Sequence, residues 1–135
     1  MEKLIITVAP VGAEVTRKDN PNVPLTAEEI AEEAVRCEAK GASIIHLHVR
    51  DAEGNATQDK EVFREAIKLI KQRTNLIVQT STGGAAWMKA EERLQPVELK
   101  PEMATLSTGT VNFGEEVFYN PPPVIETFAR AIAAN

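Results

Sequence analysis

Two histidines, separated by one residue, are the side chains best suited to chemistry in this sequence. His46 and His48 lie in the apolar run at residues 43–51 and are the only histidines among the 135 residues. Successive side chains of a β-strand alternate between its faces, so a strand here would place His46, His48 and Arg50 on one face. Two imidazoles about 6 to 7 Å apart along a strand can bind one divalent cation. The pattern favours a metal site, and a purely structural pair of histidines is the alternative.

Other polar residues occupy the same position relative to an apolar run, directly after it or near its end. They are Glu14 after residues 4–8, Ser81, Thr82, Gly83 and Gly84 after residues 76–80, and Thr105 within residues 103–107. A Ser/Thr-Gly-Gly loop can direct hydroxyls and backbone N–H groups at a carboxylate, because glycine permits close approach. An ordinary tight turn at residues 81–84 and a solvated loop residue at Glu14 remain alternatives. Arg50 can face the same site or form a structural ion pair with Asp51.

Four strand-then-helix units would position these residues. The predicted strands are residues 4–8, 43–51, 76–80 and 103–107. Thr26 and Glu29 have the spacing of a capping box, which predicts that a helix starts there, and Gly41 stops it. Apolar residues at helical spacing predict a second helix over residues 62–70, and residues 89–94 form a short helix at best. A last helix follows the prolines at 121–123, while residues 12–24, 51–55 and 108–114 read as loops or turns.

Strands that alternate with helices imply a parallel α/β sheet. Two architectures compete, an open doubly wound sheet and an arc of a β/α barrel. An open sheet gathers its ligand groups at one switch point, whereas a barrel carries them after many successive strands. Because polar groups follow all four strands, we expect four β-α units of a TIM (β/α)8 barrel, forming a half-barrel over residues 1–135.

Composition narrows the range of partners. A formal net charge of -5 and a pI near 5.1 argue against nucleic acid or an anionic membrane surface as a partner. Aromatic residues make up only 4%, which disfavours a base-stacking surface. The single cysteine, Cys37, cannot form an internal disulfide, and no apolar run could span a bilayer. The N-terminus lacks the pattern of a signal peptide, so we expect a cytoplasmic protein.

Five segments of the sequence stand out together: TVAPVGAE at residues 7–14, IHLHVR at 45–50, QTSTGG at 79–84, KPEMATL at 100–106 and NFG at 112–114. They closely resemble the β-keto acid cleavage enzymes, which include the 3-keto-5-aminohexanoate cleavage enzyme. The similarity covers essentially the whole chain, in order and with family-like spacing. It implies a zinc-dependent (β/α)8 barrel in which a β-keto acid and acetyl-CoA exchange to give acetoacetate and a new acyl-CoA.

The resemblance also assigns roles to residues. It implies that His46 and His48 bind zinc and that Ser81 and Thr105 hold the substrate carboxylate, with the loop residues Thr82, Gly83 and Gly84 beside them. It implies that Glu14, counted as both catalytic and substrate-binding, reaches the variable end of the substrate. Zinc would polarise the β-keto oxygen and stabilise the negative charge that develops there.

The chain is shorter than a complete barrel, and three hypotheses about its function follow. A complete barrel needs about 250 residues, and the resemblance implies that a third zinc ligand, a glutamate, and further catalytic residues belong to later strands without counterparts here. The first hypothesis is therefore the N-terminal half of such an enzyme, with impaired activity alone. The second is a non-catalytic half-barrel that forms a homo-oligomer to cover its open strand edges. The third is an amidohydrolase-like metal hydrolase, although that family places its His-x-His motif on the first strand and needs further histidines.

Overall fold

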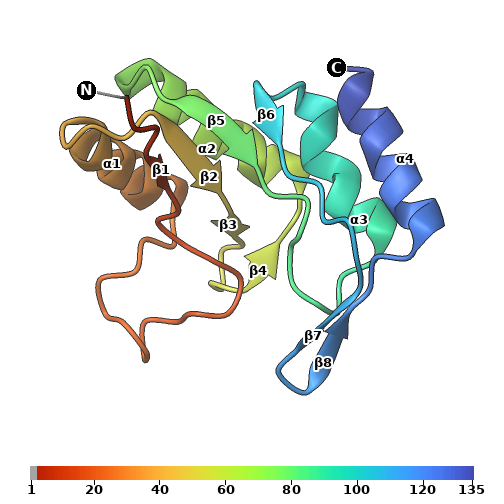
Figure 1. Ribbon diagram of the computed structural model, residues 1–135. Helices are drawn as coiled ribbons and strands as arrows, with labels where there is room; N and C mark the ends of the chain where they lie inside the picture. The colour runs from red at the N-terminus through yellow and green to blue at the C-terminus, as the bar shows by residue number, and fades with distance from the viewer. Residues whose placement is uncertain (1–2) are drawn as a thin grey trace.

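A four-stranded parallel sheet organises the computed structural model, which describes residues 3–135 (Figure 1). Its strands lie side by side in the order β1-β2-β5-β6, the same order in which they occur along the chain. Their bounds are Thr7–Val8, Ile44–Leu47, Ile77–Thr80 and Met103–Ala104. A doubly wound sheet reverses its strand order at a switch point, and this sheet does not. The predicted arc of successive barrel-type units is confirmed.

Helices follow the strands of this sheet. They are α1 over Ala27–Glu38, α2 over Lys60–Arg73, α3 over Ala90–Leu94 with the 3-10 helix η1 over Gln95–Leu99, and α4 over Pro122–Ala133. Thr26 and Glu29 form the predicted capping box, in which each side chain accepts a hydrogen bond from the other residue's backbone N–H. Asp59 caps α2 in a similar way, because its carboxylate accepts from the N–H groups of Glu61 and Val62. These caps satisfy donors that the first helical turn leaves unpaired.

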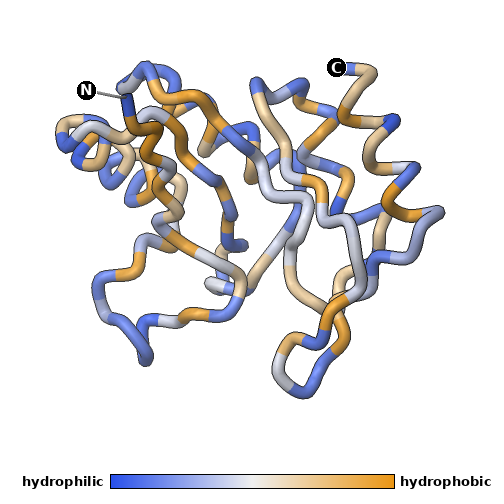
Figure 2. Tube along the Cα trace, viewed as in Figure 1, coloured by the Kyte–Doolittle hydropathy of each residue, from blue (hydrophilic) through white to orange (hydrophobic). Residues whose placement is uncertain are grey.

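The core lies between the sheet and helices α1 and α2. In β2, Ile45 and Leu47 are completely buried, while Ile44 and His46 on the opposite face are only half-buried. Ile30 from α1 and Phe63 from α2 belong to the same buried cluster. Figure 2 shows the corresponding apolar stretches along the strands. The alternation that the sequence predicts therefore turns one face of β2 to the helices and leaves the face with His46 outside the core.

Two hairpins depart from the prediction. The expected strand at residues 43–51 breaks at His48, after which β3 (Val49–Arg50) pairs antiparallel with β4 (Ala56–Thr57) around the predicted turn. The expected loop at residues 108–114 is wrong over its second half, because β7 (Val111–Phe113) pairs with β8 (Glu116–Phe118). Gly114 has a φ of 63° at the start of the two-residue connection, a conformation that glycine adopts without strain.

The hairpin and the longest loop meet at one end of the sheet. The β1–α1 loop and the β7–β8 hairpin both lie at the lower end in Figure 1, toward which the strands of the sheet run.

The expected strands at residues 4–8 and 103–107 are shorter than predicted, at two residues each. Within residues 3–135, the helices are too short or too polar to cross a bilayer.

Candidate functional site

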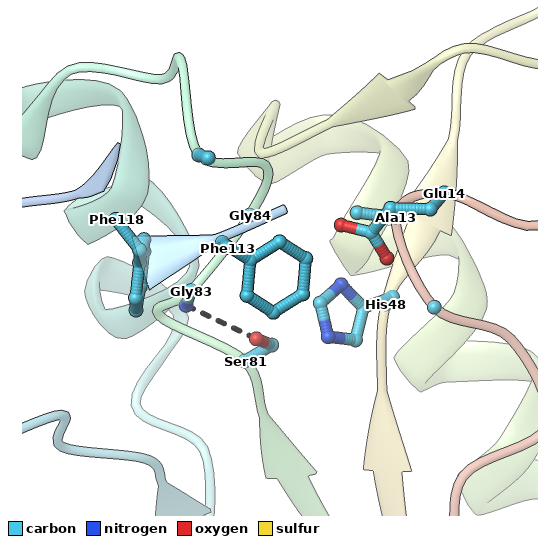
Figure 3. A pocket seen from close by; sticks show the side chains of 10 residues that line it. Ala13, Glu14, His48, Ser81, Gly83, Gly84, Phe113 and Phe118 are labelled. Carbon is cyan, nitrogen blue, oxygen red and sulfur yellow. Dashed lines mark hydrogen bonds between the residues drawn. The ribbon is translucent and has the colours of Figure 1, made fainter. Parts of the chain in front are cut away.

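A pocket of about 210 Å³ opens at the C-terminal end of the parallel strands (Figure 3). His48 enters it from the end of β2, Ser81 from the residue after β5, and Glu14 from the loop after β1. Phe113 and Phe118 of the β7–β8 hairpin form an aromatic wall. The remaining lining residues are small: Gly12, Ala13, Gly83, Gly84 and Ala86.

The two histidines lie side by side with their rings edge to face. Their ring centroids are 5.1 Å apart, and the ring planes are inclined at 69°. Nδ1 of His46 lies 2.9 Å from Oε1 of Gln79, its neighbour in register on β5. A carboxamide oxygen can only accept a hydrogen bond, so Nδ1 of His46 is the donor and its hydrogen points at Gln79. Gln79 thus orients His46 as outer partners orient metal-binding histidines.

His48 is held in its neutral form. Burial lowers the pKa of His48 to about 4, and the neighbouring charges of His46 and Arg50 act in the same direction. At neutral pH its imidazole therefore carries a lone pair. A metal ion binds histidine only in this neutral state.

The histidine pair fits part of a zinc site. The neutral imidazole of His48 and the imidazole of His46, which Gln79 orients, are suitable zinc ligands. A catalytic zinc usually has three protein ligands, however. Within residues 3–135, no group of three or more His, Cys, Asp or Glu side chains is arranged to hold a metal ion. Among the described residues, His46 and His48 could therefore supply two ligands of such a site.

The loop after β5 is tightly constrained. Ser81 is buried, its N–H donates to the carbonyl of Leu47 at 3.0 Å, and its Oγ accepts from the N–H of Gly83 at 3.1 Å. Gly84 has a φ of 61°, and a Cβ at this position would lie 2.5 Å from Sδ of Met88. Glycine is required here for both conformation and space. Residues 81–84 therefore form a tight turn that can also bind a ligand, since the turn presents Ser81 and Gly83 to the pocket.

Thr82 and Thr105 bind each other rather than lining the pocket. The Thr82 hydroxyl donates to the Thr105 carbonyl at 2.7 Å, and the Thr82 N–H donates to Oγ1 of Thr105 at 3.0 Å. Neither residue belongs to the lining, and Thr82 is completely buried. The predicted site residues therefore separate into two groups. Glu14, His48, Ser81, Gly83 and Gly84 line the pocket, whereas His46, Thr82 and Thr105 do not.

Arg50 has a structural role that differs from the ion pair considered above. Its guanidinium donates to the carbonyls of Gly12, Val15 and Gly54, at distances from 2.7 to 3.2 Å. The Asp51 carboxylate instead accepts backbone N–H groups within its own turn. Arg50 thereby holds the loop that carries Glu14 against β3.

Sequence reasoning missed several residues around the pocket. The aromatic wall could have been found, because Val111 to Phe113 alternates apolar and polar residues, Gly114 follows as a turn residue, and Val117 and Phe118 form a second apolar stretch. Arg93 and Gln58 hold the Ser81–Gly84 loop through hydrogen bonds to the carbonyls of Thr82 and Ser81. No local pattern marks these two residues, since their partners lie more than ten positions away.

Comparison with known proteins places these features in a family. Residues 3–135 match the model of the beta-keto acid cleavage enzyme family. The chain is 56% identical to a 3-keto-5-aminohexanoate cleavage enzyme of Fusobacterium nucleatum over 98% of its own length and 49% of that protein. It is 54% identical to the enzyme of the same name from Acetoanaerobium sticklandii, over all of its own length and 50% of that protein. A 3-oxoadipate:acetyl-CoA acetyltransferase of Cupriavidus necator is 35% identical over 96% of this chain and 46% of its own length.

Solved structures support the fold. The ternary complex of ObcA with a C4-CoA adduct and oxalate superposes with a TM-score of 0.69 and 24% identity, over 79% of this chain and 28% of ObcA. The chain spans about half the length of the curated relatives it matches. The family match covers all of the pocket described above. This chain belongs to the beta-keto acid cleavage enzyme family.

Proposed function

We propose that this chain supplies the zinc-binding and carboxylate-binding part of the active site of a β-keto acid cleavage enzyme. The reaction would exchange a β-keto acid with acetyl-CoA, giving acetoacetate and a new acyl-CoA. One observation carries the proposal: His48, Ser81 and Glu14, which come from three successive strand ends, line one pocket (Figure 3). The printed names of the relatives, which include a cleavage enzyme and an acetyl-CoA acetyltransferase, support it.

Each pocket residue has a function that follows from its position. When bound to His46 and His48, zinc would supply Lewis-acid stabilisation of the β-keto oxygen. The Ser81 hydroxyl accepts from Gly83, so its own proton is free to donate to a substrate carboxylate. Phe113 and Phe118 make one side of the pocket apolar, which would strengthen polar interactions with a bound substrate.

Glu14 is suited to the variable end of the substrate. Its carboxylate lies at the pocket wall opposite the Ser81–Gly84 loop, as Figure 3 shows. An ammonium group such as that of 3-keto-5-aminohexanoate would form a charge-assisted hydrogen bond there. A substrate with a carboxylate in this position would be repelled by Glu14. We therefore propose an amino-substituted β-keto acid as the preferred substrate class.

The first test is the zinc content per chain of the purified protein. We expect zinc in the native chain and none in the His46→Gln/His48→Gln variant. Ser81→Ala is the matched control, because it should keep zinc while losing affinity for the β-keto acid. Equal zinc in the native chain and the double-histidine variant would refute the metal site.

The second test is acetoacetate formation from 3-keto-5-aminohexanoate and acetyl-CoA. We expect activity that depends on His46, His48 and Ser81 in the assembly that completes the site. Turnover that survives both the double-histidine variant and Ser81→Ala would refute the assigned roles.

A non-catalytic half-barrel that forms a homo-oligomer is the second candidate. The observation in its favour is the open edge of the sheet at β1, preceded by exposed Leu4 and Ile5. A discrete dimer without zinc and without turnover would support this candidate over the first. Family membership removes the reason for considering an amidohydrolase.

A further inference from the structure

Arg93 is a buried cation at the back of the pocket. Only 2% of its surface is exposed, and among residues 3–135 no carboxylate pairs with it. Its guanidinium carbon lies 4.4 Å from the ring centroid of Phe118 and 5.0 Å from that of Phe128. Its N–H groups donate only to neutral oxygens, those of Thr82, Tyr119 and Asn120. Burial of a cation without an opposite charge is costly, so a purely structural contact would be met more cheaply by a neutral side chain.

The bond to Thr82 connects Arg93 with the pocket. Nε of Arg93 donates to the Thr82 carbonyl at 2.8 Å. The same peptide group carries the N–H of Gly83, which donates to Oγ of Ser81 at 3.1 Å. A cation at the carbonyl end of a peptide polarises it and makes its N–H a stronger donor. Arg93, the Thr82–Gly83 peptide and Ser81 therefore form one chain of hydrogen bonds that ends in the pocket.

Further hydrogen bonds hold the rest of the Ser81–Gly84 loop in place, so the Thr82–Gly83 peptide stays aligned between Arg93 and Ser81. Gln58 donates to the Ser81 carbonyl at 2.8 Å, and Thr105 receives the Thr82 N–H at 3.0 Å. Nη2 of Arg93 donates to Oδ1 of Asn120 at 2.6 Å. The guanidinium also lies over the ring of Phe118, which lines the pocket. Arg93 thus contacts both the Ser81–Gly84 loop and the aromatic wall.

We propose that Arg93 is a positioning residue that acts through the Thr82–Gly83 peptide to make the Ser81 hydroxyl a stronger hydrogen-bond donor to an anionic ligand. The Gly83 N–H occupies one lone pair of Ser81 Oγ, so the Ser81 proton is left available to a ligand in the pocket. Contact with Phe118 holds the aromatic wall against the same ligand. The ligand class, a carboxylate, rests on the proposed function, whereas the hydrogen-bonded chain does not.

Amide hydrogen exchange and chemical shifts of Gly83, followed by NMR, test the chain of hydrogen bonds without any ligand. In Arg93→Met we expect the Gly83 amide proton to move upfield and to exchange about tenfold faster, while core amides such as that of Val78 stay protected. Arg93→Lys keeps the charge and should restore part of both effects. Arg130→Met, on an exposed ion pair of α4, is the matched control and should leave Gly83 unchanged.

Two results would overturn the proposal. One is an unchanged Gly83 amide in folded Arg93→Met. The other is loss of protection throughout the core together with Gly83, which would make Arg93 a structural residue only. If Arg93→Met does not fold, the decision rests on the native protein, in which a scalar coupling between Nε of Arg93 and the carbonyl carbon of Thr82 must be present.

Titration with acetoacetate separates this inference from the proposed function. A Gly83 amide that responds to Arg93 variants and also shifts with acetoacetate supports both. A Gly83 amide that responds to Arg93 variants but not to acetoacetate keeps the chain of hydrogen bonds and refutes the carboxylate ligand. The Ser81→Ala variant should abolish the response to acetoacetate.

Discussion

At the scale of single residues, Arg50 decides where Glu14 lies. Its guanidinium binds the carbonyls of Gly12 and Val15 on either side of Glu14. Arg50→Met leaves these carbonyls without their partner, and we expect a loss of about 1 to 3 kcal/mol in the free energy of unfolding, measured with urea. Arg64→Met is the control, because Arg64 forms only an exposed ion pair with Glu61. Equal stability of the two variants would contradict the structural role of Arg50.

Gly84 is a second residue at which the site depends on backbone geometry. Gly84→Ala forces a side chain into a φ of 61° and against Met88 and Gln58. We expect it to lower the free energy of unfolding by about 1 to 3 kcal/mol. In Gly84→Ala/Met88→Ala the clash with Met88 is relieved, but the close contact with Gln58 and the backbone strain stay, so the loss attributable to Gly84 should shrink without vanishing. Gly109→Ala is the matched control, since a Cβ there has nothing within 4 Å and needs no left-handed backbone. A Gly84→Ala variant as stable as this control would refute the assignment.

At the scale of elements, the start of α1 responds to pH. Hydrogen bonds from the N–H groups of Thr26 and Leu25, together with Arg17, lower the pKa of Glu29 to about 2 from an ordinary value of 4.5. Because the folded-state pKa is lowered, the stabilisation is present above about pH 4.5 and is lost as the pH falls from there toward 2. Glu29→Gln should be less stable than the native chain at pH 7, and the difference should narrow between pH 4.5 and 2.5.

Controls on the same helix isolate the cap. Thr26→Ala should cost about 1 kcal/mol at every pH, because the hydroxyl that it removes does not titrate. Glu32→Gln changes an exposed carboxylate on α1 and should not reproduce the pH profile of Glu29→Gln. Urea unfolding at a series of pH values measures all three. Parallel profiles for Glu29→Gln and the native chain would refute the cap as the pH-sensitive feature.

Local signals explain which elements could be predicted. Short stretches of sequence predicted three features that the structure confirms. These are the capping box at Thr26, the alternation along β2 and the order of the β-α units. The shortened β1 and β6 could not be predicted, because strand length depends on pairing with neighbours that lie far away in the sequence. The contacts of Arg93 and Gln58 were missed for the same reason. The parallel arrangement predicted that residues after the strands, among them His48 and Ser81, lie at one end of the sheet, whereas a site role for Glu14 was indicated only by the family resemblance. The aromatic wall required the hairpin to be recognised.

At the scale of the whole molecule, the sheet ends in two open edges. The strands at these edges are β1 and β6, and the residues before β1 are strongly apolar. Leu4, Ile5 and Ile6 are 82%, 71% and 42% exposed. Open edges with exposed apolar residues favour association with another chain.

We therefore expect self-association that increases with protein concentration, measured by sedimentation velocity. Ile5→Lys places a charge on the apolar segment before β1 and should shift the distribution toward the monomer, since a charged edge resists pairing. Val35→Lys is the matched control, because Val35 is a β-branched residue that is 39% exposed on α1 and not on the segment before β1. Association through β1 would bring a second copy close to the open face that carries His46, so zinc per chain should fall in Ile5→Lys if the partner completes the metal site. A native chain that stays monomeric at all concentrations, or an equal effect of both lysines, would contradict association through this edge.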